Sequence, residues 1–223
     1  MKHELEILDD PEEVARVAAH WVAGRAGTAT ADRGAFTFAV SGGRTPWAMF
    51  RELRKMTSVP WDHVVIYQVD ERVAPAGDPN RNLTNLTEAL GETKATVVPM
   101  PVENSDLEEA AGDYGLLIPA RFDLVHLGLG PDGHTASLVP GDPVLNETHR
   151  LVGVTGEYQD HRRMTLTYPG LARAAEILWL VTGADKTDAL DKLLSGDRSI
   201  PATGVHGAGQ SLILADRAAR PVT

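Results

Sequence analysis

The sequence predicts an α/β fold in which a mainly parallel sheet is flanked by helices. Short apolar runs typical of buried strands alternate along the chain with segments whose apolar residues recur at helical spacing. This alternation favours strand–helix–strand units, whose strands run parallel. No internal repeat, low-complexity tract or linker divides the 223 residues, so we expect a single domain over 1–223.

The first half of the chain is expected to begin with a strand and an amphipathic helix. Asp9 or Asp10 would cap this helix, with Pro11 in its first turn, and Gly24 and Gly27 would end it. The strands expected in this half cover 4–8, 35–40, 64–69 and 95–100. Three more helices are expected: one follows the second strand, one runs through Leu90 and one covers 103–118.

The second half continues the alternation. A short helix or turn begins at Pro169, and Gly183–Lys186 opens a last helix with Leu190, Leu193 and Leu194 on one face. The strands expected here cover 122–127, 151–154, 164–168, 176–182 and 211–215.

Composition and charge argue against several classes of function. The net charge is −10 and no basic stripe is present, so we expect no nucleic-acid partner. No apolar run approaches the roughly 18 residues that span a bilayer, and the N-terminus lacks the apolar core of a secretory signal. The lack of cysteine excludes a disulfide framework, a thiolate nucleophile and a Cys-ligated metal. We therefore expect a cytoplasmic protein without a membrane partner.

A glycine-rich turn after the second strand is a candidate anion site. Ser41-Gly-Gly-Arg-Thr45 leads into a helix for which Thr45 is the expected cap and Pro46 the expected first residue. Free backbone N–H groups and the positive end of a helix suit a phosphate. The Walker spacing and its Lys are absent, which argues against a nucleoside triphosphate. A tight structural turn with a capping Thr would explain the same residues equally well.

The stretch from His126 to Gly141 carries the strongest catalytic signal. It leaves an apolar strand through several glycines, which allow a turn and a close approach of the backbone to a ligand. Asp132 and His134 lie two residues apart, and in an extended segment their side chains would point to the same side. An acid beside an imidazole is a common way to orient a general base, so His134 is the candidate base.

Charged residues also follow the strand at 64–69. Asp70-Glu-Arg72 stands at its carboxyl end, which in α/β proteins faces the ligand crevice. A solvated loop with a local ion pair is the alternative interpretation.

The segment from Gly128 to Gly133 formally matches the dinucleotide fingerprint G-x-G-x-x-G. That fingerprint requires a long helix starting in the loop, and Pro140-Gly141 interrupts the chain within a turn or two. A hydride-transfer cofactor is therefore not expected.

Two further chemistries are less favoured by the spacing. Ser41 and Ser137 lie outside a G-x-S-x-G nucleophile elbow. His126, His134 and His149 lack the spacing of zinc ligands, so no metal is expected.

Together these motifs resemble the 6-phosphogluconolactonase family along nearly the whole chain. The motifs that carry the resemblance are Ser41-Gly-Gly-Arg-Thr-Pro46, Asp70-Glu-Arg72 with Asn82, Leu127–Gly141, Arg163-Met-Thr-Leu-Thr167 and Val181-Thr-Gly-Ala-Asp-Lys186. The central loop is specific, whereas the other motifs are shared with the related glucosamine-6-phosphate deaminases. Arg44 and Val139 depart from the family pattern, in which Ser and Phe are usual, and neither change removes a catalytic group.

The resemblance implies a Rossmann-like sheet of the glucosamine-6-phosphate isomerase/deaminase type. It implies hydrolysis of 6-phospho-D-glucono-1,5-lactone to 6-phosphogluconate, the second step of the oxidative pentose phosphate pathway, without a cofactor. The partner would be this small sugar-phosphate lactone, and we expect a monomer or weak homo-oligomer. His134 would be the general base, with Asp132 fixing its tautomer and with Asp70 and Arg72 beside the lactone ring. The implied substrate-binding residues are Ser41, Gly42, Gly43, Arg44, Thr45, Asn82, Gly133, Arg163 and Lys186.

Two rival functions remain at this stage. A deaminase or isomerase of an amino-sugar phosphate would use Asp70 to move a proton at C2. A sugar-phosphate-sensing module would bind 6-phosphogluconate without turnover, although such proteins normally carry a DNA-binding domain.

Overall fold

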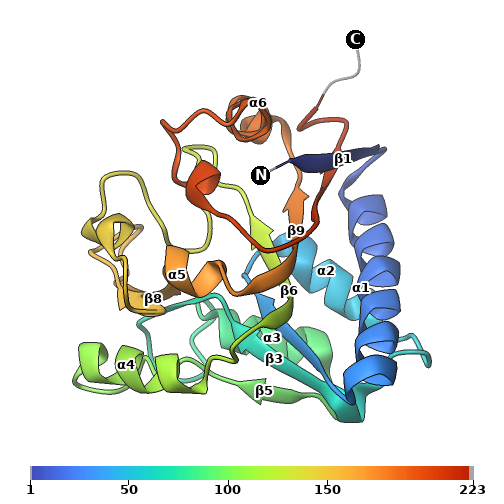
Figure 1. Cartoon of the computed structure of the whole chain (residues 1–223), viewed down its shortest axis with the longest axis horizontal. Coiled ribbons are helices and arrows are strands. Elements are labelled where there is room, and N and C mark those ends of the chain that lie inside the picture. Colours follow the sequence, from blue (N-terminus) through green and yellow to red (C-terminus); the bar gives the residue numbers. More distant parts are fainter. Residues whose placement is uncertain (1, 221–223) are drawn as a thin grey trace.

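A seven-stranded parallel sheet forms the centre of the protein (Figure 1). The computed structural model describes residues 2–220, and within them the strand order is β1-β10-β9-β6-β2-β3-β5, with every neighbouring pair parallel. The strands of this sheet are β1 (His3–Leu8), β2 (Phe36–Val40), β3 (Val64–Gln68), β5 (Thr96–Val98), β6 (Phe122–Gly128), β9 (Ala174–Val181) and β10 (Ser211–Asp216). The prediction of a mainly parallel α/β sheet is confirmed.

Helices cover both faces of the sheet. The α-helices are α1 (Pro11–Arg33), α2 (Arg44–Leu53), α3 (Asn82–Leu90), α4 (Leu107–Leu117), α5 (Tyr168–Leu171) and α6 (Thr187–Ser195). One apolar core lies between the sheet and α1, α2 and α3, and is built around Phe36, Phe38 and Phe50. The other core includes residues of α4 and α6, with Tyr114 and Trp179 fully buried in it. Strands buried on both sides explain the continuous apolar runs in the sequence.

A small antiparallel sheet lies beside the main one. Its strands are β4 (Asp70–Arg72), β8 (Arg163–Leu166) and β7 (Val152–Val154), in that order. The alternative interpretation of 70–72 as a solvated loop was wrong, because the segment is a strand that pairs with residues 163–165, far away in the chain. Three residues are too few to show a strand periodicity.

Helix α1 extends well beyond its predicted end. The left-handed C-cap is Gly34, whose φ is +80° and whose N–H donates to the carbonyl of Thr30. Gly24 and Gly27 lie inside the helix, with open space where a Cβ would stand. A helical glycine costs only about 1 kcal/mol relative to Ala, and the buried alanine-rich face of α1 outweighs this cost.

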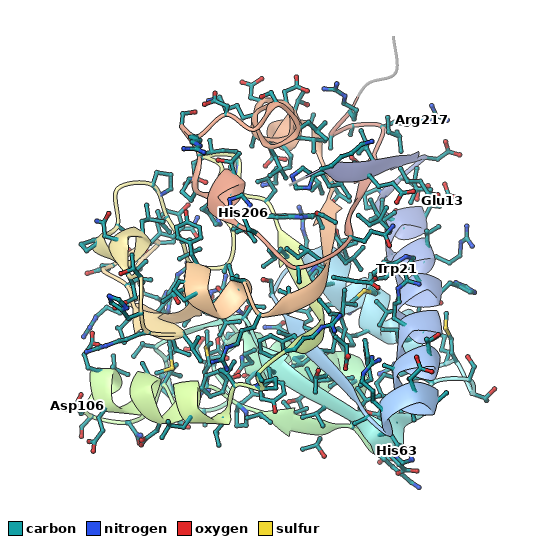
Figure 2. The ribbon with its side chains drawn as sticks, viewed as in Figure 1. Glu13, Trp21, His63, Asp106, His206 and Arg217 are labelled. Carbon is teal, nitrogen blue, oxygen red and sulfur yellow. The ribbon has the colours of Figure 1, made fainter. Side chains whose placement is uncertain are left out.

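Acidic caps fix the starts of two helices. Asp10 accepts a hydrogen bond from the N–H of Glu13, as predicted for α1. Asp106 accepts from the N–H groups of Glu108 and Glu109, so α4 begins at Leu107 rather than at 103. Figure 2 shows Glu13 and Asp106 at the starts of these two helices. Such caps satisfy N–H groups that have no partner within the helix.

No helix among residues 2–220 is both long and apolar enough to cross a bilayer.

The strand order reverses between β2 and β6, which are neighbours in the sheet. From β2 the chain proceeds to β3 on one side, and from β6 it proceeds to β9 on the other. The loops that leave β2 and β6 therefore diverge, and a crevice opens at the carboxyl ends of the strands. This is the place where ligands bind in open α/β sheets.

Candidate active site

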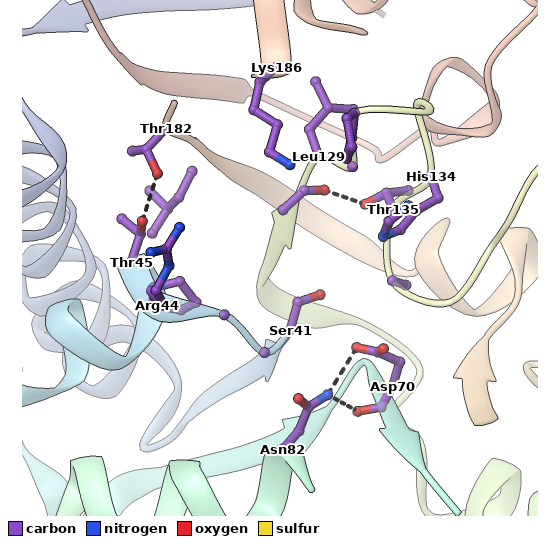
Figure 3. Close-up of a pocket in the computed structure, with 18 of the residues that line it drawn as sticks. Ser41, Arg44, Thr45, Asp70, Asn82, Leu129, His134, Thr135, Thr182 and Lys186 are labelled. Carbon is purple, nitrogen blue, oxygen red and sulfur yellow. Dashed lines mark hydrogen bonds between the residues drawn. The ribbon is translucent and has the colours of Figure 1, made fainter. Parts of the chain in front are cut away.

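A pocket of about 320 Å³ lies at this point of reversal. Its walls come from the carboxyl ends of the strands β2, β6 and β9 with the loops that follow them, and from the small sheet. The predicted site residues that line it are Ser41, Gly42, Gly43, Arg44, Thr45, Asp70, Arg72, Asn82, His134, Arg163 and Lys186. Lys186 and Thr182 face Asp70 and Asn82 across the cavity (Figure 3). Residues distant in sequence thus meet around one volume.

The glycine-rich turn approaches its surroundings very closely. A Cβ on Gly42 would stand 1.9 Å from Oδ1 of Asn82, and Gly43 has a φ of +138°. Gly43 is the N-cap of α2, so the expectation that Thr45 caps this helix was wrong. Thr45 already lies in the helix, and its hydroxyl lies 2.9 Å from that of Thr182. The free N-terminus of α2 therefore faces the pocket, which suits an anion.

Two buried polar atoms in the pocket wall lack hydrogen-bond partners within the described chain. They are Oγ of Ser41 and Nε of Arg163, and both side chains are nearly inaccessible to solvent. A buried polar group without a partner costs free energy. A polar ligand in the pocket would relieve that cost.

Four cationic side chains border the pocket: Arg44, Arg72, Arg163 and Lys186. Arg163 is held by hydrogen bonds from Nη2 to the carbonyl of Tyr158 and to Oε1 of Gln159. Burial lowers the pKa of Arg163, and Asp70 partly offsets this shift. Nζ of Lys186 lies 2.9 Å from Oδ2 of the exposed Asp185. Positive charge concentrated in one cleft agrees with an anionic substrate for a chain of net charge −10.

The carboxylate of Glu71, which the sequence did not single out, organises the wall that carries Arg72 and Asn82. It is fully buried and accepts hydrogen bonds from the backbone N–H groups of Arg72, Asn82 and Leu83 at 2.7–2.8 Å. Nε of Arg81 lies 3.5 Å from it, so the local ion pair considered for this segment does exist, although it is buried. Asn82 lies 11 residues further along the chain, so no local sequence signal marked Glu71.

Asp70 and Arg72 lie next to each other on the pocket wall. Oδ2 of Asp70 accepts a hydrogen bond from the buried hydroxyl of Ser137 at 2.7 Å. Nη1 of Arg72 donates to Oδ1 of Asn82 at 2.8 Å, and Nδ2 of Asn82 donates to the carbonyl of Asp70. Ser137 thus supports Asp70, and it does not line the pocket.

His134 and Asp132 form a close pair, with Nδ1 and Oδ1 2.6 Å apart. The expectation of an extended segment was wrong: residues 131–133 form a turn in which Gly133 has a φ of +81°. In this turn the N–H of Gly133 donates to the carbonyl of Gly130. The turn, rather than strand alternation, brings the two side chains together.

The ionisation of Asp132 determines which nitrogen of His134 is free. Partial burial acts to raise the pKa of this carboxyl, but hydrogen bonds from the backbone and ring of His134 outweigh it, and the pKa lies below its ordinary value. Asp132 is therefore a carboxylate at neutral pH, and it accepts a hydrogen bond from a protonated Nδ1 of His134. Nε2 of His134 is left as an acceptor.

Two predicted site residues do not line the pocket. Asp132 contacts His134 instead of the cavity. Gly133 packs against Ile200: a Cβ added to the glycine would stand 2.3 Å from Cβ of Ile200. The carbonyl of Gly133 accepts a hydrogen bond from the N–H of Ala202. Gly133 is thus placed as a structural glycine, and its direct contact with a ligand is not supported.

Further residues line the pocket, most of which the sequence did not single out. They include Gly128, Leu129, Gly130, Thr135, Ala136, Gln159 and Thr182. Ala136 and Gln159 have φ values of +52° and +50°, which are uncommon for residues with a Cβ and often accompany function. Within residues 2–220 no group of three or more His, Asp or Glu side chains could hold a metal ion.

Comparison with known proteins identifies relatives of this chain. Residues 9–214 match the family model described as glucosamine-6-phosphate isomerases/6-phosphogluconolactonase. The chain is 32% identical to the 6-phosphogluconolactonase of Synechocystis sp. over 98% of both chains. A crystal structure of 6-phosphogluconolactonase from Thermotoga maritima has a TM-score of 0.87 and 25% identity, covering 96% of this chain and all of the other.

The fold alone does not separate the activities in this family. The structure of a monomeric glucosamine-6-phosphate deaminase has a TM-score of 0.83 at 21% identity, covering 98% of each chain. The family match and the near-complete coverage of the relatives together show that this chain belongs to the glucosamine-6-phosphate isomerase/6-phosphogluconolactonase family.

Proposed function

We propose that this protein is a 6-phosphogluconolactonase, which hydrolyses 6-phospho-D-glucono-1,5-lactone to 6-phosphogluconate in the oxidative pentose phosphate pathway. The observation that carries the proposal is that the His134–Asp132 pair and the glycine-rich turn at 41–45 meet at one pocket. Relatives named 6-phosphogluconolactonase, similar over nearly their whole length, support the same activity.

The phosphate would bind at the start of α2. The backbone N–H groups of the turn, the hydroxyl of Ser41, which has no partner among residues 2–220, and the ammonium of Lys186 supply donors and positive charge there. Arg44 and Arg163 add further cations at the rim and in the wall of the pocket. Holding this end of the substrate fixes the position of the lactone ring.

His134 would act as the general base. With Nδ1 bonded to Asp132, Nε2 can take a proton from a water molecule that attacks C1 of the lactone. The resulting imidazolium is stabilised by the adjacent carboxylate. A lactone is an activated ester, so the reaction needs no covalent enzyme intermediate.

The tetrahedral intermediate carries an oxyanion that requires donors. Arg72 and the backbone N–H groups of the turn that follows β6 are the candidates. Collapse of the intermediate breaks the bond from C1 to the ring oxygen, and that oxygen takes the proton from the imidazolium of His134. The base is thereby regenerated.

The test is to follow lactone opening by the purified protein against the spontaneous background. Turnover well above background is expected, with no ammonia released from glucosamine 6-phosphate. Ammonia release would instead identify an amino-sugar phosphate deaminase that uses Asp70. Tight binding of 6-phosphogluconate without turnover of the lactone would identify a sensing module. Our proposal also includes one domain over 1–223, a cytoplasmic location and a monomer or weak homo-oligomer, which limited proteolysis, fractionation and sedimentation would test.

A further inference from the structure

The hairpin tip between β7 and β8 has an unusual backbone. Tyr158 and His161 pair through their backbone groups, and they enclose Gln159 and Asp160. Both enclosed residues have positive φ values, +50° and +63°, as a type I′ turn requires. Asn and Gly normally occupy such positions, and Gln is uncommon there. This strained tip lies next to the pocket, which Gln159 lines.

Tyr158, at the base of this tip, contacts both members of the catalytic pair. Its hydroxyl lies 3.3 Å from Oδ2 of Asp132, the carboxylate oxygen that does not face Nδ1 of His134. Its ring meets the imidazole of His134 edge to face, with the centroids 5.5 Å apart and the planes at 68°. The mechanism described above uses neither contact.

We propose that Tyr158 is a positioning residue for the His134–Asp132 pair, an inference that rests on the proposed lactonase function. The hydroxyl holds the second oxygen of Asp132, so that the carboxylate cannot rotate away from Nδ1. The aromatic ring restricts rotation of the imidazole. Together the two contacts keep Nε2 of His134 directed at the pocket.

The same tip also holds a substrate-facing cation. The guanidinium carbon of Arg163 lies 5.0 Å from the centroid of the Tyr158 ring, and Nη2 donates to the carbonyl of Tyr158. Partial burial and the charge of Asp132 raise the pKa of the Tyr158 hydroxyl, with Arg163 acting in the opposite direction. The hydroxyl therefore stays protonated and donates to Asp132 near neutral pH.

Kinetics of Tyr158→Phe and Tyr158→Leu test the proposal. Loss of the hydroxyl should lower kcat by roughly 3- to 10-fold with KM changed less than about twofold, because one hydrogen bond to an orienting group is removed. Loss of the ring in Tyr158→Leu should lower kcat further. Tyr67→Phe, which alters a tyrosine outside the pocket, is the matched control and should behave as the unaltered protein. Wild-type kcat in Tyr158→Phe would overturn the proposal.

A double-mutant cycle separates positioning from a general structural role. If Tyr158 acts through Asp132, then adding Tyr158→Phe to Asp132→Asn should cost no further kcat. Losses that multiply in the double variant would show that Tyr158 acts by another route.

Nitrogen NMR of the His134 ring gives a readout independent of turnover. The unaltered protein should show one tautomer with the proton on Nδ1, and Tyr158→Phe should show a mixture. If the unaltered protein lacks lactonase activity but this change is seen, the proposed function fails and the positioning role stands. Identical spectra for the two proteins would overturn the positioning role itself.

Discussion

The backbone N–H of Ser41 donates a hydrogen bond to Nδ1 of His126, at 3.3 Å, and so ties the glycine-rich turn after β2 to the neighbouring strand β6. His126 is completely buried, and no residue in the described chain pairs with its Nε2. Burial lowers its pKa from 6.5 to about 3. The imidazole is therefore neutral in the folded protein at neutral pH, and Nδ1 is the acceptor.

This arrangement predicts a stability that falls with acidification. Between about pH 6.5 and 3 the unfolded chain binds a proton at His126 and the folded chain does not, so the free energy of unfolding rises with pH. The contribution is about 1.4 kcal/mol per pH unit in that window. His126→Asn keeps a hydrogen-bond acceptor near the position of Nδ1 but cannot titrate, so this contribution to the pH dependence of the free energy of unfolding should be absent. Urea titrations from pH 4.5 to 7.5 measure it, and the exposed His149→Asn should retain the slope. Equal slopes in His126→Asn and the unaltered protein would contradict the prediction.

Replacement of the proposed base should abolish most of the catalysis. We expect His134→Ala to lower kcat by on the order of 10²–10⁴, the usual contribution of a general base. Binding of 6-phosphogluconate, measured by calorimetry, should persist because the residues at 41–45 and Lys186 are unchanged. His149→Asn controls for loss of an exposed histidine. Near-normal turnover in His134→Ala would remove this residue from the mechanism.

The charge of Lys186 should act on binding and not on the chemical step. Lys186→Gln is expected to raise KM by roughly 10- to 100-fold, the value of one charge-assisted hydrogen bond, with a much smaller change in kcat. The phosphate is remote from C1, so its contact is equal in the ground and transition states. Lys192→Gln, on the exposed face of α6, is the matched control. A fall in kcat at constant KM would place Lys186 near the reacting atoms instead.

The close approach of Gly42 to Asn82 predicts a strong effect of a single methyl group. In Gly42→Ala the new Cβ would overlap Oδ1 of Asn82, the atom that accepts from Arg72, so both side chains must move. Overpacking of this kind costs about 1–3 kcal/mol of stability, and we expect more than about a tenfold loss of kcat/KM. Thermal denaturation and steady-state kinetics measure the two effects. A Cβ on Gly112 of α4 would have open space around it, so Gly112→Ala should lower neither the stability nor kcat/KM.

The main sheet and the His134–Asp132 pair were accessible from the sequence because their signals are local. Long apolar runs marked β6 and β9, and the spacing of Asp132 and His134 marked the pair, although a turn and not an extended strand brings them together. Strands β7 and β8 of the small sheet were expected, but β4 was missed because it has only three residues and pairs with β8 across about 90 positions. Glu71 and Tyr158 were missed because their importance depends on partners that only the tertiary structure supplies.

The glycines of α1 give the clearest test of a sequence expectation that failed. If Gly24 ended the helix, as its pattern indicated, an alanine there would be unfavourable. The structure places it in an exposed helical position with nothing near a Cβ, so Gly24→Ala should stabilise the protein by roughly 0.5–1 kcal/mol through the lower entropy of the unfolded chain. Gly34→Ala should do the opposite, because the C-cap has a φ of +80° that disfavours a side chain. Urea denaturation of both variants measures these shifts, and destabilisation by Gly24→Ala would mean that α1 is interrupted where the sequence pattern had placed its end.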